Sequence, residues 1–353
     1  SLLLILCLCA ALLPVTALAA ETIVTNEKDL RTALSTGGTV KLRENIKLAA
    51  ALEIDNTVTL DLNGYEIARG EYVGEINAVN IKDGGHLTLT DSSNESGVIS
   101  NFDGSVHVLA GGTFTMNGGR LLAGVAHGSG IGAQGGGVLV DAGGLFVMNG
   151  GSIENCWANG EGGGVYVASS GTFEMSGGSI ENCYASSSPL GVGKGGGVYV
   201  GGTFTMTGGT IKNNAVNKAF AEDGAEGAGV YVANGANATL IEANITDNKR
   251  TSYENDQPLL DDPKAVTDNI STADGVEWKE YTSSIDPDYP LISILPALTK
   301  DLPFTDVTST DWFYSDVKYA YETGLMTGTS ADAFSPEAPV TRGMVMTILA
   351  RRE

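Results

Sequence analysis

The sequence predicts a mainly β protein, and its largest part is expected to be a parallel β-helix, a solenoid of stacked coils. Two observations lead to this prediction: a nine-residue phrase bracketed by glycine returns four times, and short strand-like segments recur with it. The phenylalanines of the phrase are Phe114, Phe146, Phe173 and Phe204, so the copies are about 30 residues apart. A repeat of this length is one supersecondary unit that buries its apolar face by stacking on its neighbours.

Three segments of each repeat have the character of short strands. The first is of the Val-Tyr-Val type, the second contains Phe-x-Met, and the third follows Gly-Gly and centres on isoleucine. Apolar and variable residues alternate in the first two, which is the period of a half-buried strand. Besides the phenylalanines, the equivalent apolar residues are Met116, Met148, Met175 and Met206, together with Ile153, Ile180 and Ile211. We expect each set to form an inward ladder, and Asn155, Asn182 and Asn213 to form a polar ladder at a turn.

Residues 21–250 are expected to make up this domain, with a cap at its N-terminal end. Asn26 precedes a short pattern in which Leu30, Ala33 and Leu34 share one helical face, so a capped amphipathic helix is predicted there. Because a solenoid exposes its core at its ends, we expect this helix to cover the first coil.

Composition limits the function classes. The chain has 353 residues and a formal net charge of −22, which disfavours binding to a polyphosphate backbone, so no nucleic-acid partner is expected. Residues 2–19 are apolar except for Thr16 and lead into Ala-Leu-Ala-Ala, a pattern that favours a secretory signal peptide at residues 1–20 over a transmembrane anchor. No later stretch is apolar enough to span a bilayer, so no membrane span is expected after signal removal. The chain starts with Ser and lacks a basic leader, and we expect its natural start upstream.

Two cysteines lie beyond the signal, and both follow Ile-Glu-Asn at the same place in successive repeats. These residues, Cys156 and Cys183, are too few for a disulfide framework. Stacked coils would bring them within disulfide range, but the in-register parallel geometry is unfavourable, so free thiols are favoured.

On these repeats and glycine-bracketed segments, residues 21–250 resemble the right-handed parallel β-helix, or pectin-lyase-like, family of bacterial surface proteins. Enzymes that resemble this fold cleave polysaccharides with clustered carboxylates, and the candidates here are Glu154 and Glu181, with Glu174 on the neighbouring strand. A carboxylate pair about 5 Å apart is suited to retaining glycoside hydrolysis. The alternative, two ordinary surface glutamates, is favoured because Lys212 takes the next place in their column.

Other functional candidates are weaker. His127 has the chemistry of a general base, but no Arg or Lys partner motif accompanies it, so an ordinary loop histidine is favoured. The three histidines are dispersed and no calcium-loop motif occurs, so neither a metal site nor a cofactor is expected. Tyr166, Tyr199 and Tyr231 are predicted to form an outward column, which serves either to stabilise the sheet or to stack on sugar rings.

Composition changes after residue 250. Residues 251–302 lose the glycine repeat and gain prolines, which predicts an extended linker, with a strand pair near 276–281 and 291–294. Residues 303–353 predict a small α-helical module: one helix ends at Gly324, and a second begins with Thr341 as its cap.

The motifs of residues 303–353 resemble those of the surface-layer homology (SLH) module. The matching elements occur in order: Phe304-Thr305-Asp306-Val307, Trp312, Gly324-Leu325-Met326-Thr327-Gly328, Phe334-Ser335-Pro336 and Thr341-Arg342. The resemblance implies non-covalent binding of secondary cell-wall polysaccharide, with Arg342 pairing with the anionic polymer and Asp306 and Trp312 shaping the site. For these last two, a purely structural role remains the alternative. Gly343-Met344 departs from the family's Ala-Glu, and we expect further modules beyond Glu353 because the family usually needs three.

The sequence therefore predicts a secreted bacterial cell-surface protein that its SLH module attaches to the cell wall or S-layer. The β-helix is expected to act as an adhesin, a glycan-binding surface or a structural spacer, with host or environmental glycans as possible partners. The alternative is a wall-anchored polysaccharide lyase or glycoside hydrolase that uses the β-helix face.

Overall fold

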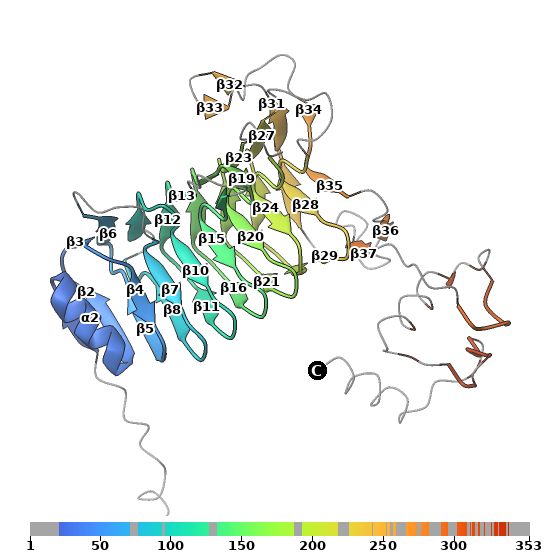
Figure 1. Ribbon diagram of the computed structural model, residues 1–353, viewed down its shortest axis with the longest axis horizontal. Coiled ribbons are helices and arrows are strands. Elements are labelled where there is room, and N and C mark those ends of the chain that lie inside the picture. Colours follow the sequence, from blue (N-terminus) through green and yellow to red (C-terminus); the bar gives the residue numbers. More distant parts are fainter. Residues whose placement is uncertain are drawn as a thin grey trace, which may run out of the picture. The chain divides into compact units, whose positions relative to one another are not determined.

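The chain divides into two compact units, Ser1–Ile294 and Leu295–Glu353, which are drawn as a ribbon in Figure 1. A computed structural model describes most of the first unit and part of the second. The described residues are 21–70, 77–93, 96–126, 133–186, 193–217, 226–241, 243–251, 253–254, 257–258, 266–273, 277–281, 291–295, 302–308, 311, 313–314, 317, 321, 326, 328–330, 332–336 and 338.

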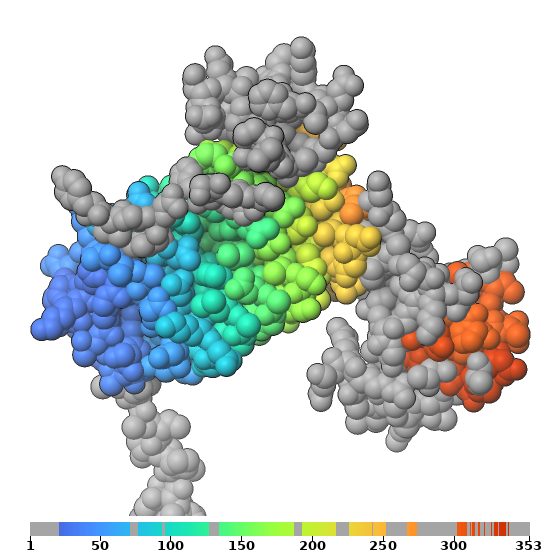
Figure 2. All heavy atoms as spheres, viewed as in Figure 1, coloured from blue at the N-terminus to red at the C-terminus, as the bar shows by residue number. Residues whose placement is uncertain are grey.

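The first unit is a parallel β-solenoid, and each repeat contributes one strand to each of three long sheets. The sheet that holds the Phe-x-Met segments, here called the Phe sheet, continues through successive coils by parallel pairing. Its parallel strands are β1 (Thr22–Val24), β2 (Gly38–Leu42), β5 (Thr57–Asp61), β8 (His86–Thr90), β11 (Thr113–Met116), β16 (Leu145–Met148), β21 (Thr172–Met175), β25 (Thr203–Met206) and β29 (Asn237–Leu240). Figure 2 shows these coils following one another in sequence order along one axis.

Two further sheets are built in the same way. The Val sheet contains β4 (Leu52–Ile54), β7 (Val79–Ile81), β10 (Val106–Val108), β15 (Val138–Val140), β20 (Val165–Val167), β24 (Val198–Val200), β28 (Val230–Val232) and β35 (Ile270–Thr272). The Ile sheet contains β3 (Ile46–Leu48), β6 (Glu66–Arg69), β9 (Val98–Ser100), β12 (Arg120–Leu122), β17 (Ser152–Glu154), β22 (Ser179–Glu181), β26 (Thr210–Lys212) and β30 (Asn244–Thr246).

The predicted inward ladders are confirmed. Phe114, Phe146, Phe173 and Phe204 are in register on adjacent strands, and their rings stack with centroid distances of 5.0, 4.6 and 4.8 Å. The equivalent methionines and isoleucines are also in register, and all of these side chains are buried. Stacking therefore gives one continuous apolar column, which supplies the hydrophobic free energy that a single repeat lacks.

Turns between the strands explain the repeated glycines and asparagines. Gly151 has a φ of 77°, and a Cβ atom there would lie 2.5 Å from the carbonyl oxygen of Gly119 in the preceding coil. Asn155, Asn182 and Asn213 have φ values of 54–55°, a left-handed conformation that asparagine tolerates better than most residues. They thus have a backbone role. The buried positions one residue further along hold Cys156, Cys183 and Asn214, and amide side chains pair between coils there at Asn214 and Asn248.

The sequence predicted three strands per repeat, but a fourth, very short series follows the Ile sheet. Its members are β13 (Val125–Ala126), β18 (Trp157–Ala158), β23 (Tyr184–Ala185), β27 (Ala215–Asn217), β31 (Lys249–Thr251) and β34 (Val266–Thr267). Two minor sheets pair β14 (Ala133–Gln134) with β19 (Gly160–Glu161), and β32 (Tyr253–Glu254) with β33 (Gln257–Pro258). Most of these strands have only two residues, and their residue types change from coil to coil, so no repeated pattern predicted them.

Helix α2 (Glu27–Thr36) lies at the N-terminal end of the solenoid, beside strands of the first coil (Figure 1). Asn26 is its N-cap and accepts a hydrogen bond from the backbone N–H of Asp29 at 2.9 Å. Leu30, Ala33 and Leu34 are buried in the same apolar cluster as the strands. Arg31 pairs with Glu27 and donates to the carbonyl oxygens of the Ala50–Ala51 turn, which fixes the helix to the chain below it.

Strands from the segment after residue 250 adjoin the last coils. β37 (Leu291–Leu295) pairs antiparallel with β29, placing Ile294 opposite Ala238, and β36 (Glu277–Tyr281) follows in the same sheet. The Phe sheet therefore continues past its last parallel strand into residues for which the sequence predicted a linker with a strand pair. Pairing of this kind protects a sheet edge from other chains.

In the second unit, the described residues include a small apolar cluster of Phe304, Val307 and Val317. The ring of Phe304 lies 5.0 Å from that of Tyr321 and 5.4 Å from that of Phe334. The predicted second helix, which begins at Thr341, lies outside the described residues. Within the described part of the chain, no helix is long and apolar enough to cross a bilayer.

Candidate functional site

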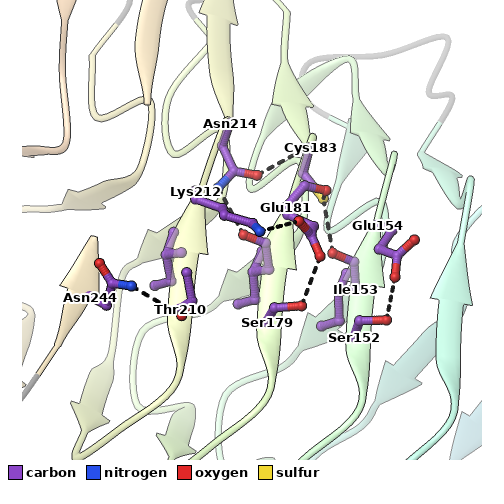
Figure 3. Close-up of polar contacts among 12 residues, drawn as sticks. Ser152, Ile153, Glu154, Ser179, Glu181, Cys183, Thr210, Lys212, Asn214 and Asn244 are labelled. Atoms are coloured by element: carbon purple, nitrogen blue, oxygen red, sulfur yellow. Dashed lines mark hydrogen bonds and ion pairs between the residues drawn. The ribbon is translucent and has the colours of Figure 1, made fainter. Parts of the chain in front are cut away.

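The outward face of the Ile sheet carries a shallow polar depression over β12, β17 and β22. Because side chains alternate along a strand, burying Leu121, Ile153 and Ile180 turns their neighbours outward. The depression has a volume of about 510 Å³ and is lined by Gly119, Arg120, Gly150, Gly151, Ser152, Glu154, Gly178, Ser179 and Glu181. Figure 3 shows its serine and glutamate side chains side by side on neighbouring strands.

Glu154 is held by a cation from the preceding coil. Arg120 donates to both of its carboxylate oxygens, at 3.2 Å from Nε and 2.7 Å from Nη2, and the Ser152 hydroxyl donates at 2.5 Å. Burial alone raises the pKa of Glu154, but the hydrogen bonds from Arg120 and Ser152 outweigh it, so the pKa lies below its ordinary value. This carboxylate is therefore ionised at neutral pH and has no proton to donate.

Glu181 takes the same position one coil later but draws its cation from the opposite side. Lys212 lies 3.1 Å from Oε2, and the Ser179 hydroxyl donates to Oε1 at 3.1 Å (Figure 3). The structure thus brings the two candidate carboxylates to equivalent positions on adjacent strands, each beside its own cation. Glu174 lies on β21 of the Phe sheet, away from this pair. Glu154 does not suit the role of a glycosidase acid, which needs a raised pKa.

The predicted tyrosine column is present on the Val sheet. Tyr166, Tyr199 and Tyr231 are in register, and their rings stack with centroid distances of 4.9 and 5.5 Å. Burial, followed by the charge of Glu161, raises the pKa of Tyr166 and of Tyr199. The ring faces cover one another, and Tyr231 is only 3% exposed, so little ring face is left for a sugar to stack on. This geometry supports the structural role of the column more than stacking on sugar rings.

A polar ladder beside these tyrosines was missed by the sequence reasoning. Gln134, Glu161, Lys194 and Glu226 pair in register from coil to coil. Lys194 donates to the Tyr231 hydroxyl at 2.7 Å, and burial raises the pKa of Glu161. The available signal was positional: each of these residues directly precedes a Gly-Gly-Gly or Gly-Ala-Gly turn.

The stacked cysteines belong to an internal hydrogen-bonded column. Cys156 and Cys183 are free and fully buried, and burial raises the pKa of the Cys183 thiol. Cys183 Sγ lies 3.6 Å from the carbonyl oxygen of Ile153 in the preceding coil. Asn214 and Asn248 continue the column, and the Nδ2 group of each donates to the preceding coil's isoleucine carbonyl at 3.0 Å. Both thiols are shielded from solvent by burial, which makes them unreactive, so this column is structural.

Asp306 is the one candidate wall-binding residue that the structure describes. Its carboxylate accepts hydrogen bonds from the backbone N–H groups of Phe334 at 2.9 Å and Ser335 at 2.7 Å, which lower its pKa. It therefore braces the Phe-Ser-Pro turn. Trp312 and Arg342 lie outside the described residues, as does His127 of the first unit. Among the residues that are described, no group of three or more His, Cys, Asp or Glu side chains is placed to hold a metal ion.

Together the fold and the C-terminal motifs define the class of protein: a parallel β-solenoid followed by a small module with SLH-like motifs. Comparison with known proteins agrees on the module, because residues 303–343 match the model of the S-layer homology domain. A stretch of 49 residues is 45% identical to an endoglucanase of Bacillus sp. (strain KSM-635). That stretch is 14% of this chain and spans only 5% of the relative's length. No solved structure matches the chain.

Proposed function

We propose that this chain is a cell-surface protein that its SLH domain attaches non-covalently to secondary cell-wall polysaccharide. The observation that carries the proposal is the match of residues 303–343 to the SLH domain, whose relatives bind cell-wall polymers. The strongly negative formal charge of −22 suits a protein displayed outside the cell.

Within the SLH domain, Arg342 is proposed to pair with the anionic polymer, while Asp306 and Trp312 shape the site. A guanidinium presents a fork of donors that matches a carboxylate, which is the physical reason for assigning Arg342 this role. Asp306 supports its assignment by holding the backbone of Phe334 and Ser335, since a braced turn keeps neighbouring side chains in a fixed geometry.

The remaining parts of the chain are proposed to display the β-helix at the cell surface. Residues 1–20 act as the secretory signal, and residues 21–250 form a right-handed β-helix that α2 caps at its first coil. Residues 251–302 connect it to the SLH module at 303–353. The burial of Leu30 and Leu34 in the solenoid core supports the capping role of α2. The β-helix then acts as an adhesin, a glycan-binding surface or a spacer.

The second candidate, a wall-anchored polysaccharide lyase or glycoside hydrolase, rests on two observations: the local similarity to an endoglucanase, and the carboxylates of Glu154 and Glu181 on adjacent strands. The lowered pKa of Glu154 disfavours this group as the general acid, which must be protonated, and leaves it only the role of the ionised nucleophile or base. Incubation with soluble polysaccharides and assay for new reducing ends or unsaturated products distinguishes the two. Turnover that Glu154→Gln or Glu181→Gln abolishes would favour the enzyme.

Wall attachment is tested by sedimentation with purified cell walls. The intact chain is expected in the pellet, whereas a chain that ends at residue 300 stays in the supernatant. Arg342→Ala is expected to weaken sedimentation, and Arg43→Ala, an exposed arginine of the solenoid, serves as the matched control. Equal sedimentation of the intact and shortened chains would contradict the proposal.

A further inference from the structure

We propose that the depression over β12, β17 and β22 binds a neutral, hydroxyl-bearing glycan chain that lies along the stacking axis and contacts successive coils. This inference rests on the proposed surface role of the solenoid and specifies the ligand class and the face that binds it. The glycan site proposed here lies on the Ile sheet and not on the tyrosine column, because the ring faces of that column cover one another.

The balance of charges in the depression favours a neutral ligand. The depression and its rim contain two cations, Arg120 and Lys212, and two anions, Glu154 and Glu181, arranged as two ion pairs. An acidic polymer would meet the glutamates and a basic polymer would meet the cations, so neither sign of charge is favoured. A sugar hydroxyl both donates and accepts, so it can bond to either member of each pair. The formal charge of −22 on the whole chain further disfavours a polyanion.

Hydroxyl groups recur from coil to coil along the stacking axis, which favours a ligand that is itself a chain. Ser152, Ser179 and Thr210 are in register, one per coil, and the two serines hydrogen-bond to the glutamates of their own strands. Paired strands lie about 4.8 Å apart, which is close to the length of one pyranose unit in an extended chain. The coils of Ser152 and Ser179 each offer a serine hydroxyl beside a glutamate carboxylate, so two neighbouring sugars can each meet such a pair through the hydroxyls that face it.

The floor of the depression also favours a glycan. Gly151 and Gly178 lie in it, and a Cβ on either would approach a carbonyl oxygen of the preceding coil to 2.5 or 2.6 Å. No side chain can stand at these positions without moving backbone, so the lining there is bare backbone that a sugar ring can approach closely.

The lining residues also predict how affinity is distributed. None of the nine is aromatic, so each sugar is held by hydrogen bonds alone and binds weakly. Affinity should then accumulate along the chain, because binding one sugar places the next beside its own coil. We therefore expect the affinity of this site to depend on the number of sugar units in the glycan.

The test is calorimetric titration of the full chain with neutral β-1,4-linked gluco- and manno-oligosaccharides of one to six units. Affinity is expected to rise by roughly tenfold or more between two and four units, and then to level off once the depression is spanned. Oligogalacturonates and chitosan oligomers of matched length are expected to bind more weakly.

Two variants locate the site. Ser179→Trp fills the depression and is expected to abolish binding, whereas Thr172→Trp, on the outward face of the same coil's Phe-sheet strand, is the matched control and should bind as the unmodified chain does. Glu181→Lys makes the depression cationic and is expected to create affinity for oligogalacturonate. That gain of binding cannot arise from misfolding.

The proposal is overturned if no neutral oligosaccharide binds, if affinity is independent of chain length, or if Thr172→Trp and Ser179→Trp behave alike. Wall sedimentation of the same preparations separates this outcome from failure of the proposed function. A chain that sediments with walls but binds no neutral glycan refutes only the ligand site, whereas a chain that does not sediment refutes the anchoring.

Discussion

The Oδ1 atom of Asn214 accepts a hydrogen bond of 2.8 Å from the backbone N–H of Cys183, one coil earlier. Asn248 repeats this contact one coil later by accepting from the backbone N–H of Asn214 at 3.0 Å. Each amide also donates to an isoleucine carbonyl, so a single side chain satisfies two buried backbone groups. The column joins coils where the apolar core alone would leave those groups unpaired.

Asn214→Leu is therefore expected to destabilise the solenoid by roughly 2–4 kcal/mol, since it leaves the Cys183 N–H and the Ile180 carbonyl unpaired in the core. Denaturant unfolding followed by circular dichroism measures the change. The matched control is Asn213→Gly at the left-handed position next to it, where glycine fits the φ of 55° and little stability should be lost. Similar losses in both variants would show that the side-chain column contributes nothing specific.

The Phe ladder gives a second prediction. Phe173 is buried between two stacked rings, so Phe173→Ala is expected to cost about 3–5 kcal/mol through lost burial and the cavity that remains. Thr172→Ala, the outward neighbour on the same strand, is expected to change stability by less than about 0.5 kcal/mol. Unfolding midpoints of the two variants in guanidinium chloride give the comparison, and an equal shift would mean that the ladder does not dominate the core.

Acidic pH should destabilise the N-terminal coils of the solenoid. Burial raises the pKa of Asp61 and Asp91, but hydrogen bonds, chiefly from the backbone N–H groups of Ser92 and Gly97 respectively, outweigh it and leave both pKa values below the ordinary 3.8. A carboxyl whose pKa is lower in the folded than in the unfolded chain stabilises the folded protein. This stabilisation is complete at pH values above the unfolded-state pKa and is lost as the pH falls through the folded-state pKa. Stability should therefore decline below about pH 4.

Asp91→Asn tests this reasoning by unfolding at a series of pH values from 7 to 3. The variant is expected to be less stable at pH 7, because three backbone N–H groups lose a charged acceptor. Its stability should also fall less steeply in acid than that of the unmodified chain. An unchanged pH slope would assign the acid sensitivity to other carboxylates.

The N-terminal helix provides a fourth prediction. Leu30→Asp places a charge in the apolar contact between α2 and the first coil, and is expected to release the helix and expose the core below it. Increased binding of an apolar dye and concentration-dependent association report the exposure. Lys28→Asp, on the exposed side of the helix, should show neither effect. Identical behaviour of the two variants would contradict the capping role.

Local patterns were sufficient for the core because, in the central repeats, the Phe and Met ladders each keep one residue type at one repeat position. The spacing of Phe114, Phe146, Phe173 and Phe204 predicted the register that the structure shows. The helix near Asn26 was predictable for the same reason, since capping and amphipathic spacing are properties of neighbouring residues. The SLH module was predictable because its motifs lie within some 40 residues, and the match to residues 303–343 confirms it.

The site could be predicted only in part. The sequence placed Glu154 and Glu181 in one column, but it did not reveal that Arg120 pairs with the first, because the register sets Arg120 opposite Ser152 and the ion pair runs diagonally to it. The polar ladder of Glu161 and Lys194 was missed because its residue types change from coil to coil, and only their place before a glycine turn recurs.

By itself the amino-acid sequence determined the solenoid, its inward ladders and the SLH module, since each depends on residue types at fixed separations along the chain. Only the tertiary structure decided which charges meet, which aromatic faces are covered and which asparagines bridge the coils. The physical reason is that stacking brings residues about 30 positions apart to within hydrogen-bonding distance, and one shift in register would change every such pair.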